Sequence, residues 1–457
     1  MAAPTHHHPP DTDRARHDTP DDDGAGRPGP RDRDAIVVGA GLAGLAAAAT
    51  IARAGRSVTV LGGLTPGGRA RTDHHGGFAL NRGPHALYRR APGTEVLARL
   101  GIEPDGAGPP GGGALLWGDP RTPDVLVGLR ARQLAAPGGV GPRGLAALVR
   151  LVRAATRTDP AAVAHLSIDE WLEATVAARW RDLARTVVRI TTYVADTDRA
   201  SADVAVGQLR AARHGVDYLH GGWGQLVDAL REALAAAAGD VTWTDERARQ
   251  VARHDGRTVV ETPAGTWTGD AVVVAAGGPE TCARLLGTTA TAAWPGLGHP
   301  VRVSCLDMGL RRPPPRPVLV GVDRPLYLIA HAPAARLAPP GQALVHALVN
   351  HRTGEEPDRR HTRATLEALA RRAGITDDLV AVDRYLHRMT VVGALPTPDS
   401  GGLAGRPTIH APGRSGVWVA GDWVGEVGFL ADASLASGEA AGRAAVAHLD
   451  ARADHRS

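Results

Sequence analysis

A glycine-rich turn directly follows a short apolar stretch, and this pattern limits the possible folds more than any other in the chain. Residues 35–38 are apolar, and the sequence GAGLAG that comes next places glycine at positions 39, 41 and 44. Gly39 permits a tight turn, Gly41 lets the backbone approach a pyrophosphate, and Gly44 allows a helix to pack closely on the strand. An Ala-rich helix should follow, and residues 57–61 should form the next strand. This order of strand, turn, helix and strand predicts the start of a dinucleotide-binding fold.

A second glycine motif contains arginine. Gly67, Gly68 and Arg69 are followed closely by Arg71. The glycines expose backbone N–H groups, and a guanidinium group can make a bidentate contact with phosphate. A surface turn with exposed arginines is the alternative interpretation of the same residues.

A third motif lies near the other end of the chain. Gly421 and Asp422 follow an apolar strand, where a carboxylate can accept hydrogen bonds from ribityl or ribose hydroxyls. A closing helix should begin at about residues 432–434, and the positive end of its dipole would then face an electron-rich ring edge. Taken alone, Asp432 reads simply as a helix cap.

The second strand lacks the acid that usually ends it. Leu61 is followed by Gly62 and Gly63, where Asp or Glu would hold a ribose diol. Losing a charge-assisted hydrogen bond costs roughly 1.5–3 kcal/mol, so the nucleotide should bind more weakly. Glu at position 62 is therefore expected to tighten binding. NADP gains little support, because Gly63 and Leu64 follow where an arginine would hold its extra phosphate.

Length, charge and cysteine content exclude several classes of protein. A chain of 457 residues is too long for one ordinary core, so two or three domains are expected. All 52 basic residues are Arg, interleaved with 48 acids, whereas a nucleic-acid binder would gather its basic residues on one face. Cys282 and Cys305 make neither a disulfide framework nor a zinc site, so we expect a cytoplasmic protein without a metal. No apolar run is long enough to cross a bilayer.

Together the motifs VVGAGLAG, PGGRART and GDWVGEVGFLADASLASG resemble the flavin amine oxidase, phytoene desaturase and protoporphyrinogen oxidase superfamily. The segments LNRGPHALY, YLHGGWGQLVDAL and DAVVVAAGG agree, so the resemblance extends from about residue 35 to residue 447. It implies an α/β fold in which a discontinuous Rossmann-like domain binds FAD noncovalently, beside a mixed α/β substrate domain and a mainly helical cap. The cofactor contacts that it implies are Gly39, Ala40, Gly41, Gly44, Gly67, Gly68, Arg69, Arg71, Ala248 at the adenine, Gly421, Asp422, and Ala433 and Ser434 at the flavin pyrimidine.

The segmentation of the chain follows from these signatures and from the pattern between them. Helical periodicity is strongest from about residue 130 to 214, and one amphipathic helix is expected at residues 144–156. That helix either packs on its own domain or rests on an anionic membrane surface. The predicted parts are a disordered tail (1–34), FAD-binding segments (35–105, 215–295 and 401–450), a helical cap (106–214), a substrate domain (296–400) and a short tail (451–457).

The resemblance predicts flavin-dependent oxidation, and the composition narrows the reaction. Amine-oxidising members often place a Lys–water pair at flavin N5, but this chain has no Lys. We therefore expect hydride removal from an apolar or large cyclic small molecule, as in phytoene desaturase-like or protoporphyrinogen oxidase-like enzymes. The alternatives are an amine oxidase lacking the Lys, and a degenerate FAD fold with a binding or isomerase role.

Few residues are candidates for acid–base chemistry. His85 follows the second glycine motif, and Glu426 lies close to Asp422, so we predict these two as catalytic residues. A structural histidine and a solvated loop acid are the alternative interpretations. Three further histidines could line a substrate cavity or simply pack in the core: His220, His331 and His387.

Overall fold

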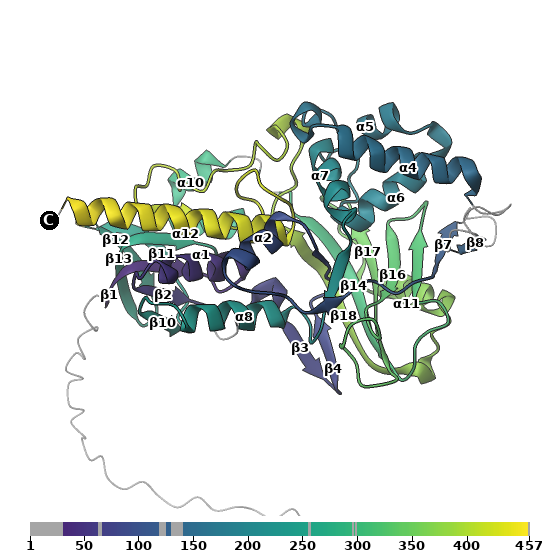
Figure 1. The fold of residues 1–457 in the computed structure, drawn as a ribbon, viewed down its shortest axis with the longest axis horizontal. Helices are drawn as coiled ribbons and strands as arrows, with labels where there is room; N and C mark the ends of the chain where they lie inside the picture. The colour runs from purple at the N-terminus through teal and green to yellow at the C-terminus, as the bar shows by residue number, and fades with distance from the viewer. Residues whose placement is uncertain are drawn as a thin grey trace, which may run out of the picture.

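The computed structural model describes residues 31–62, 66–117, 125–128, 140–254, 257–294, 297 and 299–455. Most of the predicted N-terminal tail, part of the region expected to be helical before residue 140, and Gly63 and Leu64 lie outside these residues. The described chain forms two large sheets, one at each end of the view in Figure 1, with helices packed around both. The fold is α/β with a discontinuous nucleotide sheet, which confirms the predicted fold class.

The first sheet takes its strands from three separate parts of the chain. Its path runs β10-β2-β1-β13-β12-β11, and β19 also pairs with β13. The pairs joining β10, β2, β1, β13 and β19 are parallel, so their carboxyl ends meet at one edge. The strands are β1 (Arg31–Val38), β2 (Val58–Leu61), β10 (Val241–Thr244), β11 (Gln250–His254), β12 (Arg257–Thr262), β13 (Gly265–Val274) and β19 (Val417–Val419).

Alternate residues of β1 face two different helical layers, as expected for a sheet covered on both sides. Val37 packs in one cluster with α1 (Leu42–Arg53), α8 (Gly224–Ala235) and α12 (Ala431–Asp454). Ile36 packs in another cluster with α9 (Pro279–Leu286). Figure 1 shows α1, α8 and α12 lying along the same face of the sheet.

Strand β1 begins at Arg31, four residues before the ordered structure was expected to start at residue 35. Its charged first half reads as part of a disordered tail, but the sheet supplies partners for it. Arg31 pairs with Glu246 at 2.6 Å and Arg33 with Asp240 at 2.7 Å, while the backbone from Arg31 onward pairs with β13. These partners are distant in sequence, so the local sequence pattern around residues 31–34 does not reveal them.

The second sheet is mostly antiparallel, in the order β18-β14-β17-β16-β15-β7-β8. One face packs on α11 (Arg359–Arg372), whose Leu366 and Leu369 meet Leu306 and Val345. The strands are β7 (Ala114–Trp117), β8 (Val125–Gly128), β14 (Val301–Leu310), β15 (Val318–Gly321), β16 (Leu326–Ala330), β17 (Ala343–His351) and β18 (Val380–Val392). The opposite face of this sheet is called the front face below.

Four helices form a cap beside the front face, as Figure 1 shows at the upper right. They are α4 (Gly141–Arg157), α5 (Ile168–Thr175), α6 (Arg181–Thr192) and α7 (Ala202–Ala212). Helix α4 packs through Leu151 and Ala155, leaving Val149 and Val152 exposed beside its arginines. No helix among the described residues is long and apolar enough to span a membrane. Contact of α4 with a membrane surface stays a prediction.

Smaller elements join the two sheets. These are β3 (Thr72–His75), β4 (Phe78–Asn81), β5 (Leu87–Tyr88), α2 (Pro92–Arg99), β6 (Gly106–Ala107), β9 (Val216–Leu219) and α10 (Thr288–Ala293). The residue limits of the predicted domains stay a prediction.

Candidate active site

The first glycine motif adopts the geometry that its spacing predicts. Gly39 has a φ of +111°, and a Cβ atom there would lie 2.5 Å from the Ala275 carbonyl oxygen. A Cβ atom at Gly44 would lie 1.9 Å from the Gly39 carbonyl oxygen, so only glycine fits at this close approach of helix and turn. Gly41 faces open space and caps the first turn of α1, whose N–H groups are thereby available to an anion.

The second glycine motif lies against the first. The Gly67 N–H donates to the Ala40 carbonyl oxygen at 2.7 Å, and Gly67 also forms a parallel bridge with Gly41. Both Gly67 and Gly68 have positive φ values, of 101° and 54°. The structure therefore brings the two predicted phosphate loops together at the carboxyl edge of the sheet.

Arg69 and Asp422 meet beside these loops, although 353 positions separate them. An Arg69 Nη1 donates to Asp422 Oδ2 at 2.8 Å and also to the Val391 carbonyl oxygen at 2.8 Å. The Gly393 N–H donates to the same Asp422 oxygen at 2.9 Å. The other oxygen, Oδ1, is buried and has no hydrogen-bond partner in the described chain. A buried carboxylate oxygen without a donor is costly, and a ligand hydroxyl would satisfy it.

Arg71 has a different environment from Arg69. Its Nε lies 2.8 Å from a carboxylate oxygen of Asp73 at the start of the β3–β4 hairpin. The carboxylate of Asp73 thus offsets the charge of Arg71. The contact of Arg71 with the cofactor stays a prediction.

The missing acid at Gly62 has a steric explanation. A Cβ atom at Gly62 would lie 2.7 Å from the Ala40 Cβ and 3.5 Å from the Trp243 ring. Such a short carbon–carbon distance requires Ala40, and hence the first glycine motif, to move. The Arg231 guanidinium stacks over the Trp243 ring at 5.4 Å. This close contact predicts that Glu at position 62 disturbs the turn, whereas the missing acid alone led to the expectation of tighter binding.

Ala248 lies in the loop between β10 and β11, near the same carboxyl edge. It packs against the cluster that contains Val38, Leu61 and Ala276, which end or follow three parallel strands. Ala248 is therefore near the edge where a dinucleotide binds in this class of fold. Its contact with adenine stays a prediction.

The N-terminus of α12 lies next to that of α2. Ala433 is fully buried and Ser434 nearly so, in the first turn of α12. The Gly93 N–H of α2 donates to Asp432 Oδ1 at 3.0 Å. Burial raises the pKa of Asp432 to about 7, although the Gly93 hydrogen bond acts in the opposite direction. A carboxyl group that titrates near neutral pH thus lies beside the helix end predicted to face the flavin.

The two predicted catalytic residues have contrasting surroundings. His85 Nδ1 lies 2.9 Å from the Gly83 carbonyl oxygen, and its ring packs 4.8 Å from that of Trp223. Burial lowers the pKa of His85 to about 4, so its imidazole is neutral at pH 7. Glu426 is exposed in the loop before α12. The catalytic roles of both residues stay predictions.

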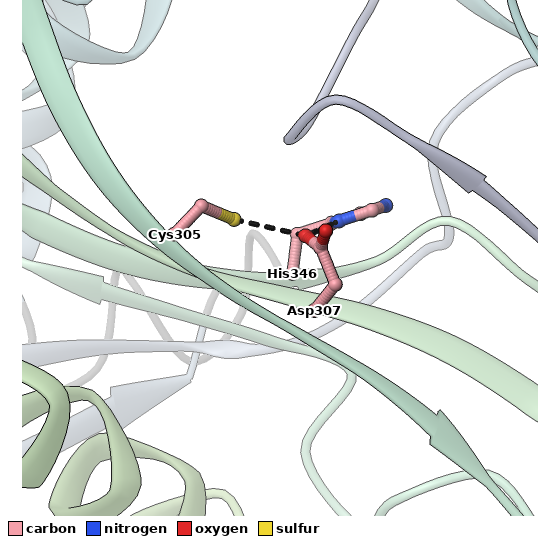
Figure 2. Close-up of side chains that lie close together, drawn as sticks. All are labelled: Cys305, Asp307 and His346. Carbon is pink, nitrogen blue, oxygen red and sulfur yellow. Dashed lines mark hydrogen bonds and ion pairs between the residues drawn. The ribbon is translucent and has the colours of Figure 1, made fainter. Parts of the chain in front are cut away.

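The structure also shows a polar group that sequence reasoning missed. Cys305, Asp307 and His346 lie together on the front face of the second sheet, all fully buried (Figure 2). Of the three histidines considered as cavity residues, only His331 joins this group, packing 4.5 Å from the His346 ring. His220 lies beside Asp105 and Arg336, and His387 hydrogen-bonds to Tyr385. A histidine inside an otherwise apolar strand was the available signal for His346.

Comparison with known families identifies the family to which this chain belongs. The sequence matches the family described as flavin containing amine oxidoreductase over residues 42–446. The chain belongs to this family. It is accordingly a flavin-dependent oxidoreductase with FAD as its cofactor, which confirms the resemblance, the enzyme class and the cofactor predicted from the motifs.

Several solved structures share the fold of this chain at low sequence identity. An oxidoreductase from Methanosarcina mazei aligns with a TM-score of 0.69 and 18% identity, over 89% of this chain and 99% of that one. Cyclohexylamine oxidase from Brevibacterium oxydans gives 0.66 and 17%, over 93% and 100% of the two chains. A protein described as a putative protoporphyrinogen oxidase, from Exiguobacterium, gives 0.63 and 17%, again over 93% and 100%. Among curated proteins, no sequence matches significantly.

The described residues fit FAD. Open space at Gly41 and the free N–H groups of α1 suit a pyrophosphate, and the unpartnered Oδ1 of Asp422 suits a hydroxyl of the ribityl chain. Arg69 lies between these two features and can exchange its bond to Asp422 for a phosphate oxygen. FAD supplies the electron acceptor of the flavin enzymes, and these residues would bind and orient it.

Proposed function

We propose that the enzyme removes hydride from an apolar or large cyclic small molecule held between the front face and the helical cap. The observation that carries this proposal is the composition of that interface. Apolar side chains from the two sides pack against one another there as one cluster: Val303, Tyr327, Leu348, Leu386 and Met389 from the sheet, and Leu145, Leu148 and Leu183 from the cap. Such a surface favours burial of an apolar substrate.

The complete absence of Lys supports the same proposal. No lysine is available to activate water at the flavin, so a substrate that needs that pair is disfavoured. Amine oxidation is nevertheless the second candidate, because the family description and the name of cyclohexylamine oxidase both refer to amines. Any amine would have to use another proton acceptor.

The test compares two probes under anaerobic conditions. The FAD-loaded enzyme is mixed with protoporphyrinogen or with cyclohexylamine, and the flavin absorbance is followed in a stopped-flow instrument. We expect the porphyrinogen to bleach the flavin faster than the amine, by about tenfold or more in the second-order rate constant, a difference of roughly 1.4 kcal/mol. Faster bleaching by cyclohexylamine would contradict the proposed substrate class and favour the amine alternative.

A further inference from the structure

Four polar side chains meet on the apolar front face because of strand register. Cys305 and Asp307 are two residues apart on β14, so both side chains project from the same face. Within the ladders, His346 on β17 lies directly opposite Asp307, and so does Arg384 on β18. The group is therefore built by three neighbouring strands rather than by flexible loops.

Hydrogen bonds within the group fix the state of its members. His346 Nδ1 lies 2.6 Å from Asp307 Oδ1, and the Cys305 thiol donates to the same oxygen at 3.0 Å. Arg384 donates to Asp307 Oδ2 through Nη2 at 2.6 Å and Nε at 3.1 Å. Burial alone would raise the pKa of Asp307, but His346, Arg384 and Cys305 together hold it below its usual value. Asp307 is consequently ionised and accepts the Nδ1 proton of His346.

This arrangement leaves one nitrogen unused. In the imidazole tautomer that has its proton on Nδ1, the Nε2 atom carries a lone pair that can accept a proton. Nε2 is buried and has no hydrogen-bond partner among the described residues. Figure 2 shows the imidazole projecting away from Cys305, beyond the carboxylate of Asp307. Leaving a buried polar atom without a hydrogen-bond partner is unfavourable, and a bound ligand that donates a hydrogen bond would satisfy it.

The group lies close to the elements that hold the cofactor. A Cβ atom at Gly83 would lie 3.9 Å from the Cys305 Cβ, and the Gly83 carbonyl oxygen accepts from the His85 ring. His85, two residues after Gly83, is one of the two predicted catalytic residues. Strand β18 also runs from the group toward Arg69: Arg384 binds Asp307, and seven residues later the Val391 carbonyl oxygen accepts from Arg69.

We propose that His346 Nε2 is the general base of the reaction and that Asp307 is its positioning residue. This inference rests on the proposed function. In the step, the substrate C–H bond breaks and its electron pair leaves with the hydrogen as hydride, which FAD, when bound, would accept. The proton of a neighbouring N–H or O–H group passes to His346 Nε2, and the electrons of that bond form a C=N or C=O double bond. The substrate thus loses one hydride and one proton, and His346 later returns its proton to water.

The base narrows the substrate class. Free imidazolium has a pKa near 6.5, so imidazole takes protons from N–H or O–H groups far more readily than from a saturated carbon. A cyclic substrate with ring N–H groups therefore suits this site better than a hydrocarbon polyene.

The same residues could also be considered as metal ligands, since one atom from each of Cys305, Asp307 and His346 lies within 4.8 Å of the others. Their mutual hydrogen bonds and the Arg384 ion pair already balance the group without a cation.

Kinetics of the FAD-loaded enzyme provide the first test. With protoporphyrinogen as the probe, we expect His346→Gln to slow flavin bleaching by about 10²–10⁴-fold at unchanged FAD content. Imidazole added to the buffer should restore part of the rate in His346→Gly. His351→Gln is the matched control, because His351 is equally buried on the same strand but hydrogen-bonds to Ser304 instead. An unchanged rate in His346→Gln would overturn the proposal.

Nitrogen-15 NMR of the histidine-labelled holoenzyme provides a test that needs no substrate. We expect His346 to carry its proton on Nδ1 in the wild type and to lose this preference in Asp307→Asn, whose amide can donate to the ring. A proton fixed on Nε2 in the wild type would overturn the proposal, even if no probe bleaches the flavin and the proposed substrate class itself fails. Stoichiometric zinc that is lost in Cys305→Ser would overturn it as well, because the residues would then be metal ligands.

Discussion

The absence of an acidic side chain at Gly62 has a steric explanation in the surrounding backbone. The acid expected there would hold a ribose, but its Cβ atom would meet Ala40 at 2.7 Å. Ala40 belongs to the turn predicted to face the pyrophosphate, and its carbonyl oxygen accepts the Gly67 hydrogen bond. Forcing the two side chains apart would therefore disturb the phosphate loops while adding a contact for the ribose.

A pair of variants separates these two effects. We expect Gly62→Glu to weaken FAD binding, since overpacking of this kind typically costs about 1–3 kcal/mol. Adding Ala40→Gly removes the atom that collides, so the double variant should bind FAD about tenfold more tightly than Ala40→Gly alone. Fluorescence titration of the apoprotein with FAD measures both. Tighter binding by Gly62→Glu alone would contradict the steric explanation.

At the scale of single residues, a role could be predicted from sequence where the backbone conformation requires one residue type. Gly39 and Gly44 could be assigned because their spacing has one structural meaning, and the structure places each in the close contact expected of it. Asp307 and His346 could not be, because their partnership depends on the register between β14 and β17. No local pattern specifies which residues will face one another across a ladder.

At the scale of elements, long periodic segments and the strands beside the glycine motif were predictable, but several other short strands were not. The Ala-rich helix expected after the first glycine motif is α1, and the helix expected at residues 144–156 is α4. Strands β10 and β16 were missed, since each has only four or five residues and forms by pairing with distant strands. The helical periodicity expected up to residue 214 passes through Val176 without a break, although the extended conformation of Val176 ends α5.

Helix α12 carries a prediction about pH. Burial raises the pKa of Asp432 to about 7 in the folded protein, against about 4 when unfolded. The folded state therefore holds this proton more tightly. The resulting stability is complete below about pH 4 and is lost as the pH rises through 7.

Chemical unfolding at two pH values tests this assignment. Between pH 5 and pH 8, the wild type should lose stability relative to Asp432→Asn by on the order of 2 kcal/mol. The Asn side chain keeps an oxygen for the Gly93 N–H but cannot ionise, so it isolates the effect of the charge. A constant difference between the two proteins across this range would show that Asp432 does not titrate there.

At the scale of the whole molecule, the cofactor site is a meeting of distant segments. Strand β1, the loop at Arg69 and the loop at Asp422 converge at one edge of one sheet. The motifs at both ends of the chain predicted this convergence because each has a defined role in phosphate or hydroxyl binding. The proposed substrate region has no comparable motif, and its apolar cluster forms only when residues of the sheet and the cap that are distant in sequence pack together.

The FAD content of the purified protein tests the central claim most directly. Asp422→Asn should weaken FAD binding by about 10–100-fold, because it removes the charge that accepts hydrogen bonds from Arg69, Gly393 and a cofactor hydroxyl. Asp450→Asn is the control. Asp450 lies near the C-terminal end of α12, far along the helix from its N-terminus, and forms an exposed ion pair with Arg56. The account predicts one FAD per chain in the wild type and in Asp450→Asn, with most of it lost from Asp422→Asn on dilution. Equal FAD retention in all three proteins would contradict the proposed site.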